Sequence, residues 1–103
     1  MGPRPSRAKR VVLKSNKILS RYYAMDSVTR EVTHTNTELT ANAVRKLGSD
    51  NLNNIDLLVC GTTLPDQTIP NHALMVHGEL KLKPLEVVST AGICLSGTTA
   101  LKY

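Results

Sequence analysis

Two short apolar runs, separated by one helical segment, constrain the fold of this chain more than any other feature. Ile55–Cys60 and Leu85–Ser89 are nearly continuous in apolar residues, which is the pattern of strands buried on both faces of a parallel sheet. Between them we predict a helix over Asn71–Leu80, with Pro70 in a first-turn position. The apolar face of this helix carries Ala73, Val76, His77 and Leu80. The order strand, helix, strand predicts the α/β class, with a right-handed crossover between parallel strands.

A further helix is predicted before the first strand. Thr37 is expected to be its N-cap and Glu38 suits its first turn, so we place the helix over Glu38–Leu47. Gly48 ends it, and Asp50–Asn54 has the composition of a turn. The face expected to be buried carries Leu39, Ala43, Val44 and Leu47 at i, i+4, i+5 and i+8.

The basic residues of the chain are concentrated in its first third. Residues 1–30 hold eight of the 13 lysines and arginines and one acid, Asp26, within a chain of net charge +5. Residues 1–10 are predicted to be coil because of their prolines and charges, and Val11–Lys14 is a possible short strand. A basic segment of this kind can bind nucleic acid or a membrane surface, but low-hydrophobicity charged segments are more often disordered.

We therefore divide the chain into a basic, disordered leader over residues 1–17 and one folded domain over residues 18–103. No apolar run approaches the length of about 20 residues that spans a bilayer, and no signal-peptide core follows the N-terminal charges. The expected compartment is the cytoplasm, and we expect no membrane partner. A disordered leader is favoured over a nucleic-acid-binding one.

The two cysteines, Cys60 and Cys94, are expected to be free thiols, as is usual in cytosolic proteins. Their spacing fits no zinc pattern, and His34, His72 and His77 do not complete a Cys/His cluster, so we expect no metal and no cofactor. Cys60 ends an apolar strand and is expected in the core. Cys94 follows a strand and a small-residue elbow at the expected start of a helix, where backbone N–H groups and the helix dipole favour the thiolate. Because a lone cysteine is often an inert small hydrophobe, position alone leaves both roles open.

Three blocks of residues occur in order along residues 18–103. The first is the helix from Thr37 to Leu47, followed by Asn54-Ile55-Asp56-Leu57-Leu58-Val59. The second is the loop Gly61-Thr62-Thr63-Leu64-Pro65-Asp66-Gln67-Thr68-Ile69-Pro70, and the third is the stretch from Glu86 to Leu101 that contains Cys94. Together they resemble beta-ketoacyl-acyl carrier protein synthase III of the thiolase superfamily. The resemblance implies part of a thiolase-like layered α/β/α fold, with an incomplete sheet and flanking helices.

By this resemblance Cys94 is the catalytic nucleophile, which accepts an acyl group from acyl-CoA. Synthases of this type are homodimeric acyltransferases of fatty acid or polyketide-like biosynthesis, and they condense the bound acyl group with malonyl-acyl carrier protein in a decarboxylative Claisen reaction. They also use a His and an Asn that lie well C-terminal to the cysteine, and nothing in this chain matches those two residues. We expect a solvated His72 and a His77 buried on an apolar helix face, so neither replaces them. The chain is therefore expected to support at most the acyl-transfer half of the reaction.

Two alternatives from other classes stay open. A chain that keeps Leu85–Ser89 without further strands exposes a sheet edge, which favours a non-catalytic fragment or a self-associating interaction module. Residues 1–30 instead point to nucleic-acid binding. In the loop, Pro65 and Asp66 are interpreted as turn geometry and local capping, and Thr62 and Thr63 as strand-end hydroxyls without a catalytic role.

Overall fold

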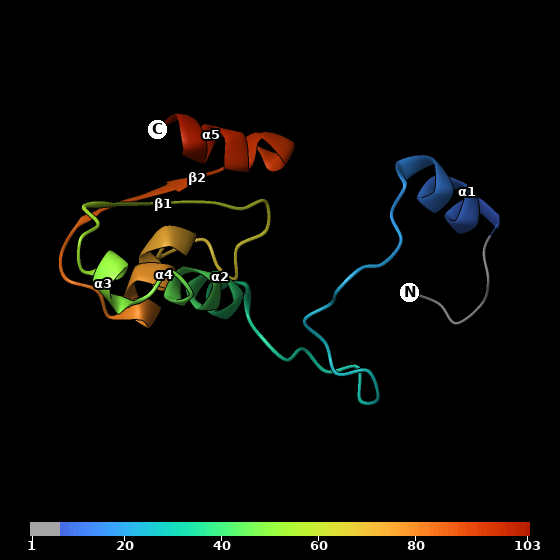
Figure 1. Cartoon of the computed structure of the whole chain (residues 1–103), viewed down its shortest axis with the longest axis horizontal. Helices are drawn as coiled ribbons and strands as arrows, with labels where there is room; N and C mark the ends of the chain where they lie inside the picture. The colour runs from blue at the N-terminus through green and yellow to red at the C-terminus, as the bar shows by residue number, and fades with distance from the viewer. Residues whose placement is uncertain (1–6) are drawn as a thin grey trace.

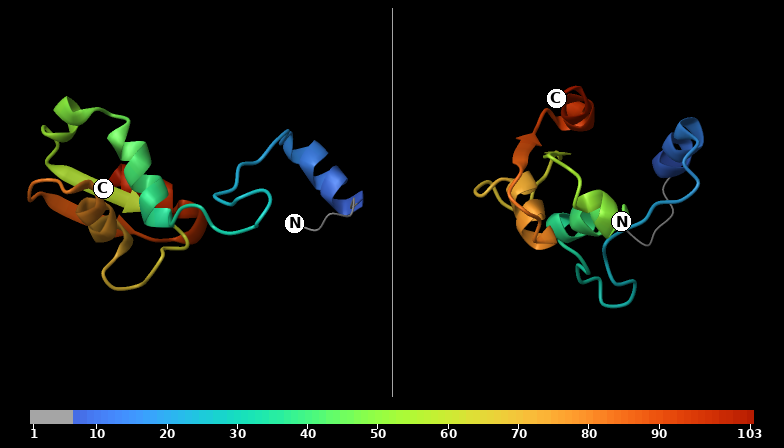
Figure 2. Two further views of the ribbon diagram at one scale, coloured as in Figure 1. Left: turned by 90° about the horizontal axis from the view of Figure 1, so that it is seen from below. Right: turned by 60° about the vertical axis from the view of Figure 1, so that its left-hand side comes forward.

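The computed structural model describes residues 7–103, which fold as helices around a small parallel sheet. In chain order the elements are α1 (Arg7–Asn16), α2 (Asn36–Arg45), α3 (Ser49–Leu52), β1 (Leu57–Gly61), α4 (His72–Leu80), β2 (Glu86–Thr90), the 3₁₀ turn η1 (Ile93–Leu95) and α5 (Ser96–Lys102). The strands and helices α2 to α5 pack together, while α1 and the chain that leads to α2 extend away from them (Figure 1, Figure 2). Among the described residues, no helix is long and apolar enough to cross a bilayer.

Strands β1 and β2 are parallel, with a register that runs from Leu57 opposite Glu86 to Gly61 opposite Thr90. Helix α4 connects them and packs against both strands and against α2. Helix α5 lies on the opposite face of the sheet from α2 and α4, as Figure 1 and Figure 2 show from two directions. The layered α/β arrangement predicted from the two apolar runs is therefore confirmed.

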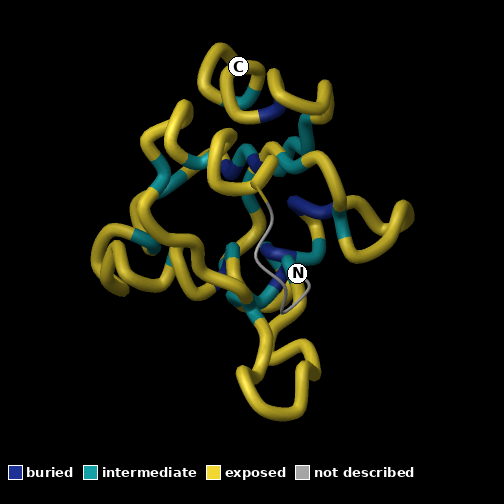
Figure 3. The backbone as a smooth tube through the Cα atoms, turned by 90° about the vertical axis from the view of Figure 1, so that its right-hand side faces the viewer, coloured by how far each residue is buried: buried dark blue, intermediate teal, exposed yellow. Residues whose placement is uncertain are grey.

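The core lies between the sheet and the α2–α4 layer, and it is built from small side chains. Its buried apolar members are Ala41, Leu58, Cys60, Ala73 and Val76. Ala41 and Ala73 are fully buried, and small residues let neighbouring helices approach closely. The tube coloured by burial (Figure 3) shows how little of the chain lies inside. Cys60 is in this core, as the sequence predicted.

Helix α2 begins two residues earlier than predicted. Its N-cap is Thr35, whose hydroxyl accepts from the N–H of Glu38 while the Glu38 carboxylate accepts from the N–H of Thr35. This reciprocal capping box satisfies two otherwise unpaired N–H groups. Thr37 is not the cap but a buried residue of the first turn. The pattern Thr-x-x-Glu at residues 35–38 is the signal that would have located the true cap.

The buried face of α2 also differs from the predicted one. Thr37 and Ala41 are buried and Val44 is half-buried, which is the i, i+4, i+7 spacing of one helical stripe. Leu39 is 46% exposed and Leu47 is 57% exposed. The prediction followed the helical spacing of Leu39, Ala43, Val44 and Leu47, and of these Val44 is half-buried while Ala43 is exposed. The stripe that packs inward is centred on Ala41, a small residue that suits the close contact with α4.

The remaining elements lie close to their predicted positions. The first strand is confirmed as β1 and the second as β2, each displaced by a residue or two toward the C-terminus. Helix α4 is confirmed, but its N-cap is Asn71, whose side chain accepts from the N–H of Leu74. Pro70 therefore precedes the cap instead of occupying the first turn. The predicted turn after α2 contains the one-turn helix α3.

The N-terminal segment corrects a further prediction. Val11–Lys14 lies within α1, so the strand expected there is wrong, as is the coil expected for residues 7–10. A short apolar run does not distinguish strand from helix by itself, and the Arg, Lys, Ala and Leu residues around it favour a helix. Residues 1–6 lie outside the described residues, and the division of the chain near residue 17 stays a prediction.

Candidate active site around Cys94

Cys94 lies on a strained turn at the carboxyl end of the parallel sheet. Strand β2 ends at Thr90, and the chain then passes through Gly92 with φ 141° and Ile93 with φ 53°. A β-branched residue with positive φ is uncommon, and it persists only where the surroundings hold it. Cys94 follows in the middle of η1 and is exposed. The helix expected to start at Cys94 begins at Ser96 instead, because a 3₁₀ turn intervenes.

The carbonyl oxygen of Ile93 accepts three hydrogen bonds, and these hold the turn in place. It accepts from the hydroxyl of Thr63 at 3.0 Å and from the hydroxyl of Ser96 at 2.8 Å. It also accepts from the N–H of Ser96. Thr90 donates its own hydroxyl to the Ser96 carbonyl at 3.0 Å. The Thr63 hydroxyl thus holds the residue before the cysteine, and the Thr90 hydroxyl holds Ser96, two residues after it. The sequence did not assign this positioning role to Thr63.

Gly61 lets α5 approach β1 closely enough for these bonds to form. A Cβ at this position would overlap the Ser96 carbonyl group, with 2.7 Å to its carbon and 2.9 Å to the Thr90 hydroxyl. Such separations are far below van der Waals contact, so any side chain would displace the helix. Gly61 is therefore required for the position of the turn that carries Cys94.

The loop after β1 is clamped to the first turn of α2 by Asp66 and Asn36. The Asp66 carboxylate accepts from the N–H of Asn36 at 2.9 Å, from the N–H of Thr37 at 2.8 Å and from the Thr37 hydroxyl at 2.7 Å. In return, the Asn36 amide donates to the Thr62 hydroxyl and to the Leu64 carbonyl, both at 2.9 Å. Asp66 therefore caps a helix 30 residues away in sequence rather than its own loop. The Thr37 hydroxyl and then the two backbone N–H groups lower the pKa of Asp66, to which nearby His72 also contributes.

His72 is buried, which contradicts its predicted exposure. It is 3% exposed because it is the first residue of α4 and faces α2. Its Nε2 lies 3.2 Å from the Thr40 hydroxyl. Since that hydroxyl donates to the Asn36 carbonyl, Nε2 is the donor in this pair, and Nδ1 has no partner among the described residues. The imidazole thus ties α4 to α2.

The other histidines and the second cysteine make contacts of their own and do not join Cys94. His77 is half-buried rather than part of the core, and its Nε2 donates to the Lys83 carbonyl at 3.0 Å. His34 contacts the Thr33 hydroxyl through Nδ1. Burial raises the pKa of the Cys60 thiol, which makes it a poor nucleophile. Over residues 7–103, no group of three His, Cys, Asp or Glu side chains is arranged to hold a metal ion.

A cavity of about 280 Å³ lies beside the turn, where the strands end and α4 begins. Most of the residues that line it carry a hydroxyl or amide group, and they are Thr62, Thr63, Pro65, Gln67, Thr68, Asn71, His72, Ser89, Thr90 and Ala91. Ligands of α/β proteins commonly bind at this end of parallel strands. Cys94 and the cavity therefore occupy the edge of the sheet at which chemistry is expected.

The chain matches no protein-family model and no curated protein sequence. Its fold is similar to that of AbyA1, a tetronic acid condensing enzyme, with a TM-score of 0.71 and 28% sequence identity. The match covers 80% of this chain and 26% of that protein, so the chain spans about a quarter of its length. The described residues thus form part of a thiolase-like layered α/β/α fold, as the sequence predicted. The comparison supports a condensing-enzyme fold and does not distinguish the synthase III type within it.

Proposed function

We propose that this chain carries the nucleophile of a thiolase-like condensing enzyme of the synthase III type, and that Cys94 accepts an acyl group from acyl-CoA. One observation carries the proposal. In a fold similar to that of a condensing enzyme, Cys94 is exposed on a strained turn at the C-terminal ends of the strands, and three hydrogen bonds to the Ile93 carbonyl hold this turn. Strain that is held by several hydrogen bonds is characteristic of functional sites.

The proposed step is a thioester exchange. The Cys94 thiolate attacks the carbonyl carbon of acyl-CoA, a C–S bond to the protein forms and the C–S bond to CoA breaks. The CoA thiolate leaves and takes up the proton that the cysteine released to solvent. A backbone N–H of the turn is the candidate donor to the oxyanion of the tetrahedral intermediate, an interaction worth about 10²–10³ in rate in other acyl-transfer enzymes.

The second half of the family reaction is the attack of decarboxylated malonyl-acyl carrier protein on the acyl-cysteine. It requires donors that stabilise an enolate oxygen. His72 and His77 are both engaged away from the turn, with Thr40 and with the Lys83 carbonyl. Residues 7–103 are therefore proposed to supply the acyl-transfer half, and a role in fatty acid or polyketide-like biosynthesis is part of the same proposal.

The test is intact-mass analysis after incubation with acetyl-CoA. We expect the chain to gain the mass of one acetyl group, Cys94→Ala to gain none, and Cys60→Ala to gain one as the wild type does. Cys60 is a matched control because it is the second thiol of the chain and is buried in the core. An adduct that persists in Cys94→Ala, or no adduct at all, would overturn the assignment.

A second candidate function is self-association through the open edge of β2, as in a homodimer. Within residues 57–90 the sheet has two strands. The N–H of Glu86 donates to the Asp56 carbonyl on the β1 side. Because successive residues of a strand direct their N–H groups to opposite sides, Val87 and Ser89 present theirs at the open edge, where a further strand can pair.

Sedimentation at several concentrations tests this second candidate. We expect a dimer for the wild type and a folded monomer for Ser89→Pro, which removes an outward N–H. Val88→Pro is the control, because its N–H is directed toward β1 and its loss is expected to disrupt the sheet itself. A wild-type chain that sediments as a monomer at every concentration would exclude self-association through β2.

A further inference from the structure

Helix α1 forms although it buries none of its own residues. Helices shorter than about 12–15 residues are marginal in water without a packing partner. The C-terminal end of α1 is well defined. Lys17, with φ 57°, is followed by Ile18, whose N–H donates to the Leu13 carbonyl at 3.2 Å, while the N–H of Lys17 donates to the Lys14 carbonyl. This is a Schellman motif, and the residue pair Leu13 and Ile18 occupies its usual hydrophobic positions.

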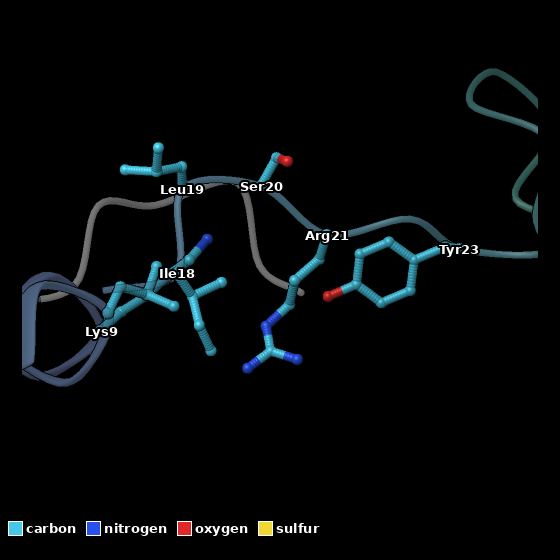
Figure 4. Close-up of a pocket in the computed structure, with 7 residues that line it drawn as sticks. Lys9, Ile18, Leu19, Ser20, Arg21 and Tyr23 are labelled. Atoms are coloured by element: carbon cyan, nitrogen blue, oxygen red, sulfur yellow. The ribbon is translucent and has the colours of Figure 1, made fainter. Parts of the chain in front are cut away.

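The Leu13 side of α1 therefore faces its own chain. It borders a hollow of about 250 Å³ that is also lined by Ile18, Leu19 and Arg21. Figure 4 shows Leu19 and Ser20 pointing to one side of the chain there and Arg21 to the other. Leu19 is fully exposed. One flank of the helix is thus partly covered, and the rest of its surface is open.

Cations and apolar side chains occupy different parts of the open surface of α1. At about 100° per residue, Arg7, Arg10 and Lys14 fall within an arc of about 60°, and together with Val11 they line a shallow hollow of about 260 Å³. We call these three cations the basic ridge. Val11 lies about 40° from Arg7 at the border of the ridge, and Val12 lies about 100° further round the helix. Their side chains are 60% and 53% exposed. The helix has no acidic residue to neutralise the ridge.

We propose that α1 lies on an anionic lipid surface, with the basic ridge among the headgroups and the two valines inserted at the acyl boundary. A cationic ridge beside exposed apolar side chains is the pattern of helices that bind in the plane of a membrane. Phosphates of a nucleic acid would need the cations alone, so the adjacent exposed valines favour lipid. The lack of a spanning segment led us to expect no membrane partner, but a helix lying on a surface needs no such segment.

Vesicle co-sedimentation of the full chain at 100 mM salt tests the proposal, with phosphatidylcholine vesicles that contain or lack phosphatidylserine. We expect binding to the anionic vesicles alone, and a partition coefficient lowered about 100-fold by the combined Arg7→Gln, Arg10→Gln and Lys14→Gln changes. The combined Val11→Ser and Val12→Ser changes are expected to lower it about 10-fold.

A matched triple variant, Lys46→Gln, Lys83→Gln and Lys102→Gln, removes the same charge from exposed positions outside α1. It is expected to bind as the wild type does. No binding to anionic vesicles, or an equal loss in this control, overturns the proposal. The proposal is also overturned if the variant with Val11→Ser and Val12→Ser binds the vesicles as strongly as the wild type. Charge alone would then explain the binding, as it would for a nucleic-acid ligand.

Discussion

The removal of the Asp66 carboxylate tests the long-range clamp that joins the loop after β1 to helix α2. Asp66→Ala deletes the acceptor of three hydrogen bonds, two from backbone N–H groups at the start of α2 and one from the Thr37 hydroxyl. Loss of a helix cap costs about 1 kcal/mol or slightly more. The Thr37 hydroxyl belongs to a buried residue, and leaving it unpaired adds about 1 kcal/mol. The expected loss in the free energy of unfolding is about 2 kcal/mol.

The pH dependence of this loss follows from the lowered pKa of Asp66. A carboxylate whose pKa is lower in the folded than in the unfolded state stabilises the fold fully above the unfolded value, close to 3.8. That stabilisation is lost as the pH falls through the folded pKa. The difference between wild type and Asp66→Ala should therefore be constant near neutral pH and shrink below about pH 4.

Urea denaturation followed by circular dichroism, at pH 7 and at several values down to pH 3, measures both effects. Asp56→Ala is the control, because Asp56 is also an exposed aspartate and no hydrogen bond of its carboxylate is present among the described residues. It should change the midpoint little. Equal midpoints for Asp66→Ala and wild type at pH 7, or a difference that does not shrink in acid, would refute the argument.

Three further predictions concern the turn and its support. Gly61→Ala should lower the free energy of unfolding by about 1–3 kcal/mol, because the added methyl group overlaps the first carbonyl of α5. Gly78→Ala is the control, since a Cβ there meets no atom within 4 Å. It should raise the free energy of unfolding by about 0.5–1 kcal/mol in the same urea titration. Mass spectrometry of iodoacetamide-treated folded protein should show Cys94 modified well before Cys60, which is buried and has a raised pKa; equal labelling would contradict the burial. Thr63→Val removes the hydroxyl that holds the carbonyl before Cys94, and it should slow acetylation of the cysteine while changing the midpoint of unfolding by no more than about 1 kcal/mol; an unchanged rate would show that this bond does not position the thiol.

Local patterns predicted those elements whose determinants lie within a few residues of one another. Both strands are recognisable because apolar residues are nearly continuous in them, and α4 because its apolar positions follow the helical period. Cys60 could be assigned to the core for the same reason, since it ends an apolar strand. This approach failed for the short run Val11–Lys14, because three adjacent apolar residues fit either a strand or one turn of a helix.

Other failures involved residues whose partners are distant in sequence. The buried face of α2 depends on α4, which selects the small side chains Thr37 and Ala41 rather than leucines. His72 was expected in solvent because helix starts are commonly exposed, yet α2 covers it and Thr40 accepts its Nε2–H. A sequence without its tertiary contacts does not reveal such pairings.

By itself, the sequence determined the order of strands and helices, the α/β class and the location of a cysteine after the second strand. These properties follow from backbone preferences and from the burial of apolar runs, which act over short stretches of chain. The tertiary structure alone decided how Cys94 is presented. Its turn is held by Thr63, and the loop of Thr63 is held by Asp66 on the first turn of α2. Hydrogen bonds between residues about 30 positions apart form only once the sheet and its helices have brought them together.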